Sequence, residues 1–478
     1  MEKLGVPSVA IVGDIFADVA VMGHRKQGFA ELPMMVWPQG YGEEWVGYED
    51  PRATILETID EIIYDLTKWA PEVSGKLTIL PEPVTFLYEG VDYQDALSKM
   101  NDDFLLRTWG DGLPLLPATE ERVEWLLTGT DLAPDELIPD LAIQPSGMLA
   151  TPRTIAINAA MAGARPEYMP VIIAALQATS GRVGFSGTNP AVPVLVVNGP
   201  IAKEIGMNSS WNFLGPSSTY PANGAIGRTL MTLGHTAGQA AGGITNLTPS
   251  GQPAHYNGVV FAEAEDRSPW EPLNAELGFA PGTNTVTCCG RAQGIINVAG
   301  MMEAGNCGEY LKGHLSRQMA FGHSNWKKAA DTPENRSATL NVSAEGAKAM
   351  ADLGYSKGDV KEMIWEASQI PLAYYEELAG DYIEGGRTNP EFTTRWEAYI
   401  SGAGQWLEPY TNLPLDTMVP IAPSPNSFVV VVSGGQLFNH FTWFVHYPGD
   451  LKAAEIQTPA NWAEILNEAP KFWEGVSF

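Results

Sequence analysis

The stretch Val194-Leu-Val-Val-Asn-Gly-Pro200 decides the fold of this chain. An uninterrupted apolar run that ends at Gly and Pro predicts a strand buried on both faces, as in the central sheet of an α/β protein. The following residues, 208–228, are rich in Asn, Ser and Gly. Short polar side chains supply hydrogen-bond donors and acceptors, and glycines let the backbone approach a ligand closely. A loop this long usually binds something, so we expect the floor of an active site here.

The N-terminal segment has the order strand, helix, strand, helix. The strands are expected at Val9–Val12 and Met34–Trp37, and Pro51 begins the second helix. This order predicts a small parallel α/β unit that is truncated, with a sheet completed by another strand from this chain or from a partner. We therefore expect an N-terminal α/β domain at 1–100 and a large mixed α/β domain at 101–478. No internal repeat is evident in the sequence.

The charge balance excludes several classes of partner. The chain of 478 residues carries 56 acidic and 28 basic residues, a formal net charge of −28. This excess argues against nucleic acids and anionic membrane surfaces, which need clustered Lys and Arg. We see no signal peptide and no apolar run long enough to span a membrane. Three cysteines are too few for a disulfide framework, so we expect a cytoplasmic protein.

The cysteines are the first candidates for chemistry. Cys288 and Cys289 are adjacent, and their side chains serve one site only if the pair lies on a turn. Together with Cys307 they are candidate ligands for zinc, copper or iron. The alternatives are a reactive thiol, in which Cys288 or Cys289 acts as a nucleophile, or buried structural cysteines.

Two carboxylates form a second candidate. Alternate residues of a strand share a face, so Glu263 and Glu265 are expected to project together. Paired carboxylates suit a general acid and base, or a hard metal ion. The alternative is chance proximity, because acidic residues are abundant in this chain.

Two arginines are expected to bind an anionic group of a substrate. Arg165 comes just before Glu167 and Tyr168 at the start of a predicted helix, and Arg228 follows the polar loop. Either guanidinium could bind a carboxylate through two hydrogen bonds, and the alternative for each is a structural ion pair. The other polar residues expected around a small-molecule substrate are Asn158, Glu167, Tyr168, Asn198, Asn208 and Ser209.

A third candidate is the turn after the apolar run Phe428–Val432. Ser433-Gly434-Gly435 has some features of a phosphate-binding turn but lacks the third glycine and the Lys-Ser/Thr of known motifs. A helix is expected next, carrying His440 as a possible substrate contact. The alternative is a hydrogen-bonded core histidine.

Several of these motifs, taken in order, resemble the UGSC-like family. The motifs that carry the resemblance are Trp109-Gly-Asp-Gly-Leu-Pro114 with Pro117, Thr154–Pro170, Val194–Pro200, Gly224-Ala-Ile-Gly-Arg228, Phe261-Ala-Glu-Ala-Glu265 with Ser268-Pro-Trp-Glu-Pro272, and Ser433-Gly-Gly435. The family is named for a tetrapeptide of Cys or selenocysteine followed by Gly-Ser-Cys. It precedes the strand that matches Val6–Ile11, and this chain lacks it; Cys288-Cys289 is a further departure.

This resemblance implies a protein split into two chains. A second, smaller subunit would supply the missing strand and its thiol or selenol, completing the sheet. We expect a subunit of a hetero-oligomeric enzyme that acts on a small organic substrate, anionic or neutral. The expected chemistry is thiol- or metal-assisted, either reductive cleavage or a lyase or hydration step, with Glu263 or Glu265 carrying protons. The alternative is a non-catalytic subunit, or a ligand-binding protein, that positions a catalytic partner.

Overall fold

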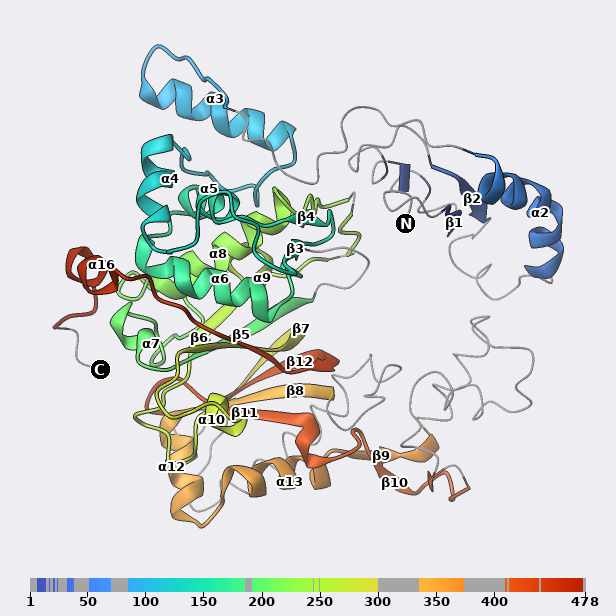
Figure 1. Ribbon diagram of the computed structural model, residues 1–478. Helices are drawn as coiled ribbons and strands as arrows, with labels where there is room; N and C mark the ends of the chain where they lie inside the picture. The colour runs from blue at the N-terminus through green and yellow to red at the C-terminus, as the bar shows by residue number, and fades with distance from the viewer. Residues whose placement is uncertain are drawn as a thin grey trace.

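The computed structural model describes residues 7–13, 17, 20–21, 24, 32–37, 51–69, 85–184, 191–243, 245–248, 250–299, 335–373, 409–410, 412–437 and 440–475. A central mixed sheet lies between two layers of helices (Figure 1). This arrangement confirms the predicted mixed α/β fold. Within the described residues, no helix combines the length and apolar character needed to cross a membrane.

The central sheet has seven strands in the order β11-β8-β12-β7-β5-β6, with β13 also paired to β7. Their bounds are β5 Val192–Asn198, β6 Val259–Ala262, β7 Thr285–Ala299, β8 Asn335–Val342, β11 Phe428–Val432, β12 His440–Asp450 and β13 Lys452–Glu455. All seven residues of β5 are buried, as its apolar sequence predicts.

Helices cover both faces of this sheet (Figure 1). The layer drawn above it contains α4 Glu120–Leu127, α5 Pro152–Ala162, α6 Met169–Ala178, α8 Ala222–His235 and α9 Ala254–Asn257. The layer below contains α12 Ala344–Asp352 and α13 Lys357–Ala367, and α10 Leu273–Glu276 is drawn level with the strand β11. Further elements are α3 Tyr93–Leu106, η4 Pro166–Tyr168, α7 Ile201–Glu204, η8 Pro425–Ser427, α16 Trp462–Glu468 and the short strand pairs β3 Ala142–Ile143 with β4 Met148–Leu149 and β9 Gln369–Pro371 with β10 Met418–Pro420.

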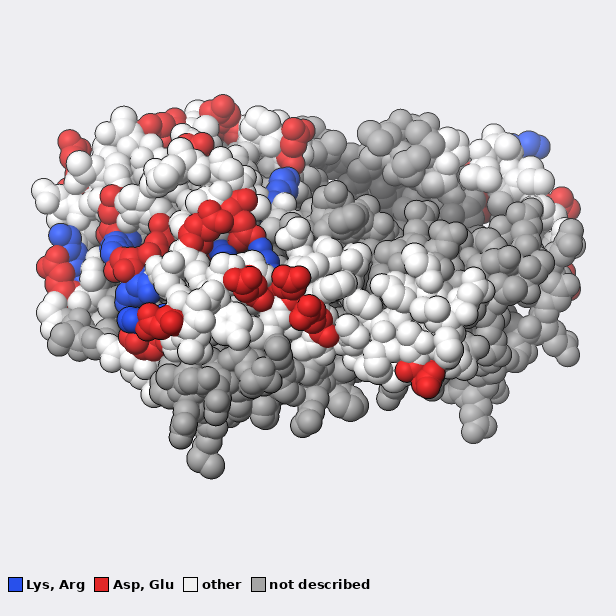
Figure 2. Space-filling view, turned by 90° about the horizontal axis from the view of Figure 1, so that it is seen from below, with Lys and Arg blue, Asp and Glu red and all other residues white. Residues whose placement is uncertain are grey.

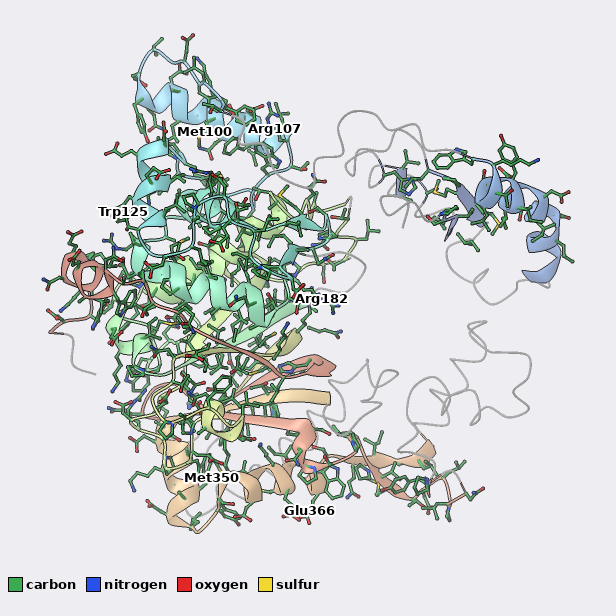
Figure 3. All side chains as sticks on the ribbon, viewed as in Figure 1. Met100, Arg107, Trp125, Arg182, Met350 and Glu366 are labelled. Atoms are coloured by element: carbon green, nitrogen blue, oxygen red, sulfur yellow. The ribbon has the colours of Figure 1, made fainter. Side chains whose placement is uncertain are left out.

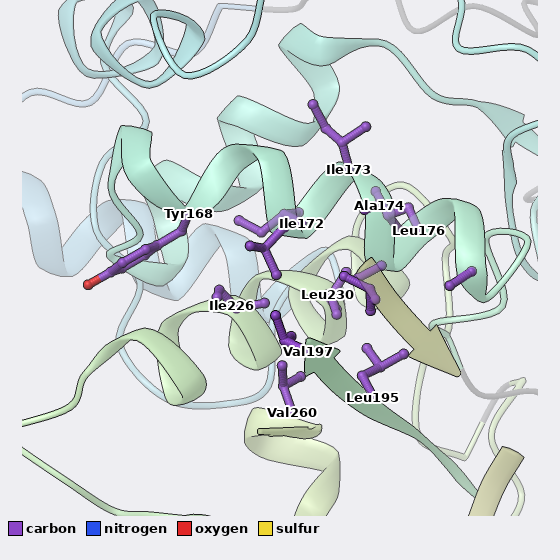
Figure 4. Close-up of a cluster of buried hydrophobic side chains, with 14 of the residues drawn as sticks. Tyr168, Ile172, Ile173, Ala174, Leu176, Leu195, Val197, Ile226, Leu230 and Val260 are labelled. Atoms are coloured by element: carbon purple, nitrogen blue, oxygen red, sulfur yellow. The ribbon is translucent and has the colours of Figure 1, made fainter. Parts of the chain in front are cut away.

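The two faces of β11 belong to different apolar cores. In the upper core, Ile172 of α6 and Leu230 of α8 lie over Leu195 and Val197 of β5 (Figure 4). The alternation along β11 separates the cores, because Val429 and Val431 join this first cluster while Phe428, Val430 and Val432 join the second. The second cluster packs against α12 and α13. Both sides of β11 are therefore buried, which explains its uniformly apolar sequence.

The topology of the sheet repeats, although the sequence shows no repeat. β5 pairs in parallel with β6 on one side and antiparallel with β7 on the other. In the second half, β8 pairs in parallel with β11 and antiparallel with β12 in the same way. The β7–β12 pair joins the two halves. The sheet is therefore two copies of one strand order arranged around a central antiparallel pair.

The N-terminal unit contains the predicted parallel strands. β1 Ala10–Gly13 pairs in parallel with β2 Met34–Trp37, and α2 Pro51–Thr67 follows. Several of its apolar side chains remain open to solvent: Ile11 is 61% exposed, Leu56 60% and Ile63 51%. Most of the helix expected between the two strands lies outside the described residues.

Charged residues of both signs are mixed on the face shown in Figure 2. Lys and Arg side chains there lie next to Asp and Glu, and no extended basic area is visible among the described residues. Lys203 with Asp266, 2.8 Å apart, is one such exposed pair. Pairs of this kind contribute little to stability, because water screens them.

Candidate active site

The strands β6 and β11, at opposite edges of the sheet, meet at their carboxyl ends. The Ala264 N–H donates to the Val432 carbonyl at 2.7 Å, and the Ser433 hydroxyl donates to the Ala262 carbonyl at 3.0 Å. The sheet therefore curls until its edges touch at this point. Residues far apart in the sequence are brought together here, at strand ends, where α/β proteins commonly place their sites.

A pair of carboxylates shares one amide group at this junction. Asn198, the last residue of β5, donates through Nδ2 to Glu263 at 2.7 Å and to Glu265 at 3.0 Å. The Gly199 N–H also donates to Glu265, at 2.6 Å. The predicted pairing of Glu263 and Glu265 is thus present, but the strand ends at Ala262 and the Asn198 amide, not strand alternation, brings the carboxylates together.

Glu263 is buried and Glu265 is partly exposed. Burial raises the pKa of Glu263, and this effect outweighs nearby Lys357 and hydrogen bonds from the Leu273 N–H and Asn198. Lys357 itself is bound elsewhere, to Glu276 at 3.0 Å and to the Glu271 carbonyl at 3.1 Å. The two carboxyl groups therefore lie in different environments, one buried and one partly exposed.

The polar loop after α7 closes over this junction. Asn208 accepts through its carbonyl from Asn223 Nδ2 at 3.0 Å and donates through its own N–H to Asn223 Oδ1 at 2.8 Å. The Ser209 carbonyl accepts from the Gly434 N–H at 2.9 Å and from Arg267 at 2.6 Å. Asn208 and Ser209 thus hold the loop at this junction through structural hydrogen bonds, and their role as substrate contacts stays a prediction.

Arg267 belongs to this site, and the sequence analysis missed it. Its guanidinium donates to the carbonyls of Ser209 and Gly434, at 2.6 and 3.1 Å, and so joins the polar loop to the turn after β11. Its position two residues after Glu265 was the available signal. The pairing with carbonyls of distant segments has no local sequence pattern.

Packing explains the glycines of the Ser433-Gly434-Gly435 turn. A Cβ atom at Gly435 would lie 2.3 Å from the Trp211 indole, and one at Gly434, whose φ is +113°, would touch Phe213. The Gly434 N–H is already used by Ser209. The turn therefore has no need of a phosphate ligand to account for its sequence.

The two predicted anion-binding arginines are already paired. Arg165 binds Glu167 at 2.7 Å and lies over the ring of Trp125 on α4, which Figure 3 labels. Arg228 binds Asp111 through two hydrogen bonds, of 2.9 and 3.2 Å. These contacts match the structural ion-pair alternative for both.

Two further predicted substrate contacts lie within the helical layer. Asn158 of α5 is buried and bonds to Thr236 and Thr154. Tyr168 is 2% exposed, and burial raises its phenol pKa. Neither has a contact with the carboxylate pair that would tie it to the junction.

The cysteine pair lies on a strand and not on a turn, so the condition for both thiols to serve one site is not met. Cys288 and Cys289 are in β7, where the register with β5 shifts between Val194 and Leu195. Both are buried, and burial raises both thiol pKa values, while the nearby Thr339 hydroxyl only partly offsets this for Cys289. A high pKa disfavours the nucleophilic thiolate, so the geometry favours buried structural cysteines.

No metal site is formed by the described residues, among which there is no group of three or more His, Cys, Asp or Glu side chains suited to a metal. Cys307 lies outside the described residues, as does Asn439. The helix expected around His440 is wrong, because His440 is the first residue of strand β12. The preceding apolar run β11 pairs with β8, and β12 returns beside β8 on its other side, so extended structure is required there.

Comparisons with known proteins give no further information on the site. No family model matches this chain, and neither a curated protein nor a solved structure does.

Proposed function

We propose that this chain is one subunit of a hetero-oligomeric enzyme acting on a small organic substrate by acid–base chemistry of the lyase or hydration type. Glu263 and Glu265 would be the proton carriers. The observation that supports this is the single Asn198 amide that holds both carboxylates, one buried and one partly exposed. Elimination of water needs a base and an acid in one site, and carboxyl groups in unlike environments supply both.

The roles follow from exposure. Glu265 has one oxygen fixed by the Gly199 N–H and by Asn198, and its partial exposure lets it take a proton from a substrate carbon. Glu263, whose pKa is raised by burial, would take up a proton when the substrate binds and donate it to the leaving hydroxyl group. Their buried, high-pKa thiols make Cys288 and Cys289 poor nucleophiles, so any thiol or selenol chemistry would come from the second subunit.

We also propose that a second subunit binds this chain. Membership of the UGSC-like family and a cytoplasmic location are further proposals. Exposed apolar side chains on β1 and α2, among them Ile11 and Leu56, support a partner that covers them. The same exposure favours the alternative of a non-catalytic subunit that positions a catalytic partner. Free, buried cysteines among the described residues fit a reducing compartment.

Proton abstraction gives a direct test. The assembly purified from its source would be incubated in D₂O with a panel of small hydroxy and keto acids, and deuterium incorporation followed by NMR. The expected result is exchange on at least one compound, slowed about 10²–10⁴-fold in Glu265→Gln. Glu263→Gln should also slow product formation, because it cannot donate a proton.

The matched control is Asp266→Asn, which removes the next carboxylate along the chain. Asp266 is half exposed and pairs with Lys203, away from the Asn198 amide. The Asp266→Asn variant should catalyse deuterium exchange into the substrate at the wild-type rate. Equal rates in all variants, or turnover by the second subunit alone, would support the non-catalytic alternative.

A further inference from the structure

The curled sheet has a concave side whose side chains can be identified from the strand registers. The Phe261 ring of β6 and the Phe444 ring of β12 stack across it, with centroids 5.7 Å apart. Residues paired with these two, and those two positions further along each strand, face the same side. Val196 pairs with both Phe261 and Thr287, and Thr339 pairs with Phe444.

Besides Thr339 Oγ1, which lies near the Cys289 thiol, four polar oxygens on this concave side have no hydrogen-bond partner among the described residues. They are Asn198 Oδ1, Thr285 Oγ1, Thr287 Oγ1 and Asn341 Oδ1. Asn198 and Thr285 are direct register partners, and all four residues are at most 3% exposed. Each buried polar atom left without a partner costs about 1–3 kcal/mol, so four on one surface call for an explanation.

All four oxygens can act as hydrogen-bond acceptors. The Asn198 amide nitrogen donates to Glu263 and Glu265, and that of Asn341 donates to the Ser433 carbonyl at 3.0 Å, so both Oδ1 atoms are acceptors. The threonine hydroxyls can accept as well. The Glu263 carboxyl group accepts from the Asn198 amide at 2.7 Å, and the Lys357 ammonium is held by Glu276 and the Glu271 carbonyl.

Neutral oxygens with one nearby carboxylate suit an ion of low charge. Hard cations take oxygen ligands, and Ca²⁺ and Mg²⁺ sites rely on several carboxylates or on retained water. A buried divalent ion here would keep an uncompensated charge, which is costly in a low-dielectric interior. A single positive charge has no such excess.

We propose that the concave side of the sheet binds one monovalent metal cation, Na⁺ or K⁺, through Asn198 Oδ1 and Thr285 Oγ1, with Thr287, Asn341 and Glu263 around it. By coordinating one oxygen from each strand, the cation would link the end of β5 to β7 where the sheet curls. This site goes beyond the proposed function, because it would hold whether or not the carboxylate pair carries protons.

The test is the thermal stability of the full chain in KCl or NaCl against choline chloride at constant ionic strength. A bound cation raises the midpoint temperature in a saturable way at low concentration, whereas general salt effects grow steadily with concentration. Thr285→Val keeps the shape and removes one oxygen, and it should raise the half-saturating concentration about tenfold, the equivalent of about 1.4 kcal/mol. Thr287→Val is the second variant if the first does not fold.

The control is Thr232→Val on α8, which removes another buried hydroxyl without a partner among the described residues. It should leave the cation response unchanged. Equal midpoints in potassium, sodium and choline would overturn the proposal, as would a normal response in both variants of β7. Crystals grown with thallium(I) supply an independent readout, where an anomalous peak at Asn198 and Thr285 supports the site and a water molecule there overturns it.

Discussion

Replacing Asn198 by alanine tests the shared amide at the centre of the candidate site. The substitution removes hydrogen bonds of 2.7 Å to Glu263 and 3.0 Å to Glu265. A hydrogen bond to a charged group contributes about 1.5–3 kcal/mol, and the bond to the partly exposed Glu265 belongs at the low end. We therefore expect Asn198→Ala to lower the free energy of unfolding by about 3–4 kcal/mol.

The same substitution in a Glu263→Gln background isolates the charge. The glutamine side chain in that background is neutral, so losing its donor costs less, and the penalty for Asn198→Ala should fall to about 1–2 kcal/mol. Urea unfolding followed by tryptophan fluorescence at about pH 7.5, where exposed carboxyl groups are ionised, measures all four proteins of the cycle. A coupling near zero would refute the shared-amide reasoning, as would a penalty below about 1 kcal/mol in the wild-type background.

Asn101→Ala is the matched control for this cycle. Asn101 also holds two segments together, but its partners are the backbone groups of Leu97 and Leu115. Neutral hydrogen bonds contribute about 0.5–1.5 kcal/mol each, and the site is separate from Glu263. Asn101→Ala should therefore lower the free energy of unfolding by the same amount in the wild-type and Glu263→Gln backgrounds, because the effects of independent substitutions are additive.

Three further predictions concern other parts of the molecule. Burial raises the thiol pKa of Cys289, so a thiol reagent at about pH 8 should label it only after unfolding in urea; rapid labelling of the native protein, read by mass spectrometry, would contradict its burial. Burial raises the pKa of Glu276, but its two lysine partners lower it further, to a net value below the usual 4.5. Its contribution to stability is therefore complete above pH 4.5 and lost as the pH falls through the lowered value, so Glu276→Gln should flatten the acid side of a plot of midpoint temperature against pH. Gly435→Ala would overlap the Trp211 indole and should cost about 1–3 kcal/mol, whereas Gly224→Ala in α8, where a Cβ meets nothing within 4 Å, should be neutral or stabilising in the same thermal assay.

The strands and helix starts that could be predicted depend on local sequence. The apolar runs of β5 and β11 require burial wherever they pack. Thr119 and Ser356 cap their helices through hydrogen bonds to residues three positions later, so a short window of sequence contains the whole signal. The carboxylate pair was found for a related reason, because Glu263 and Glu265 are close in sequence.

The features that were missed depend on contacts between distant segments. The curl of the sheet rests on pairing of residue 264 with residue 432, and no pattern around either position announces it. The partner of Arg228 is Asp111, one carboxylate among 56 acidic residues. Cys288 and Cys289 lie on β7 beside a shift in its register with β5, and no local sequence pattern marks that shift.

The repeated strand order has a consequence for the kind of site the sheet can build. Glu263 and Ser433 occupy corresponding places, since each follows the last pair of its parallel ladder and donates its N–H, at 3.0 Å, to Val197 and Val342 respectively. Two identical chains related by a twofold axis would bring the same residue to both places, setting carboxylate against carboxylate or hydroxyl against hydroxyl. Joining both halves in one polypeptide removes that symmetry constraint. A single chain can keep a proton-carrying group on one side of the pseudo-axis and a purely structural hydroxyl on the other.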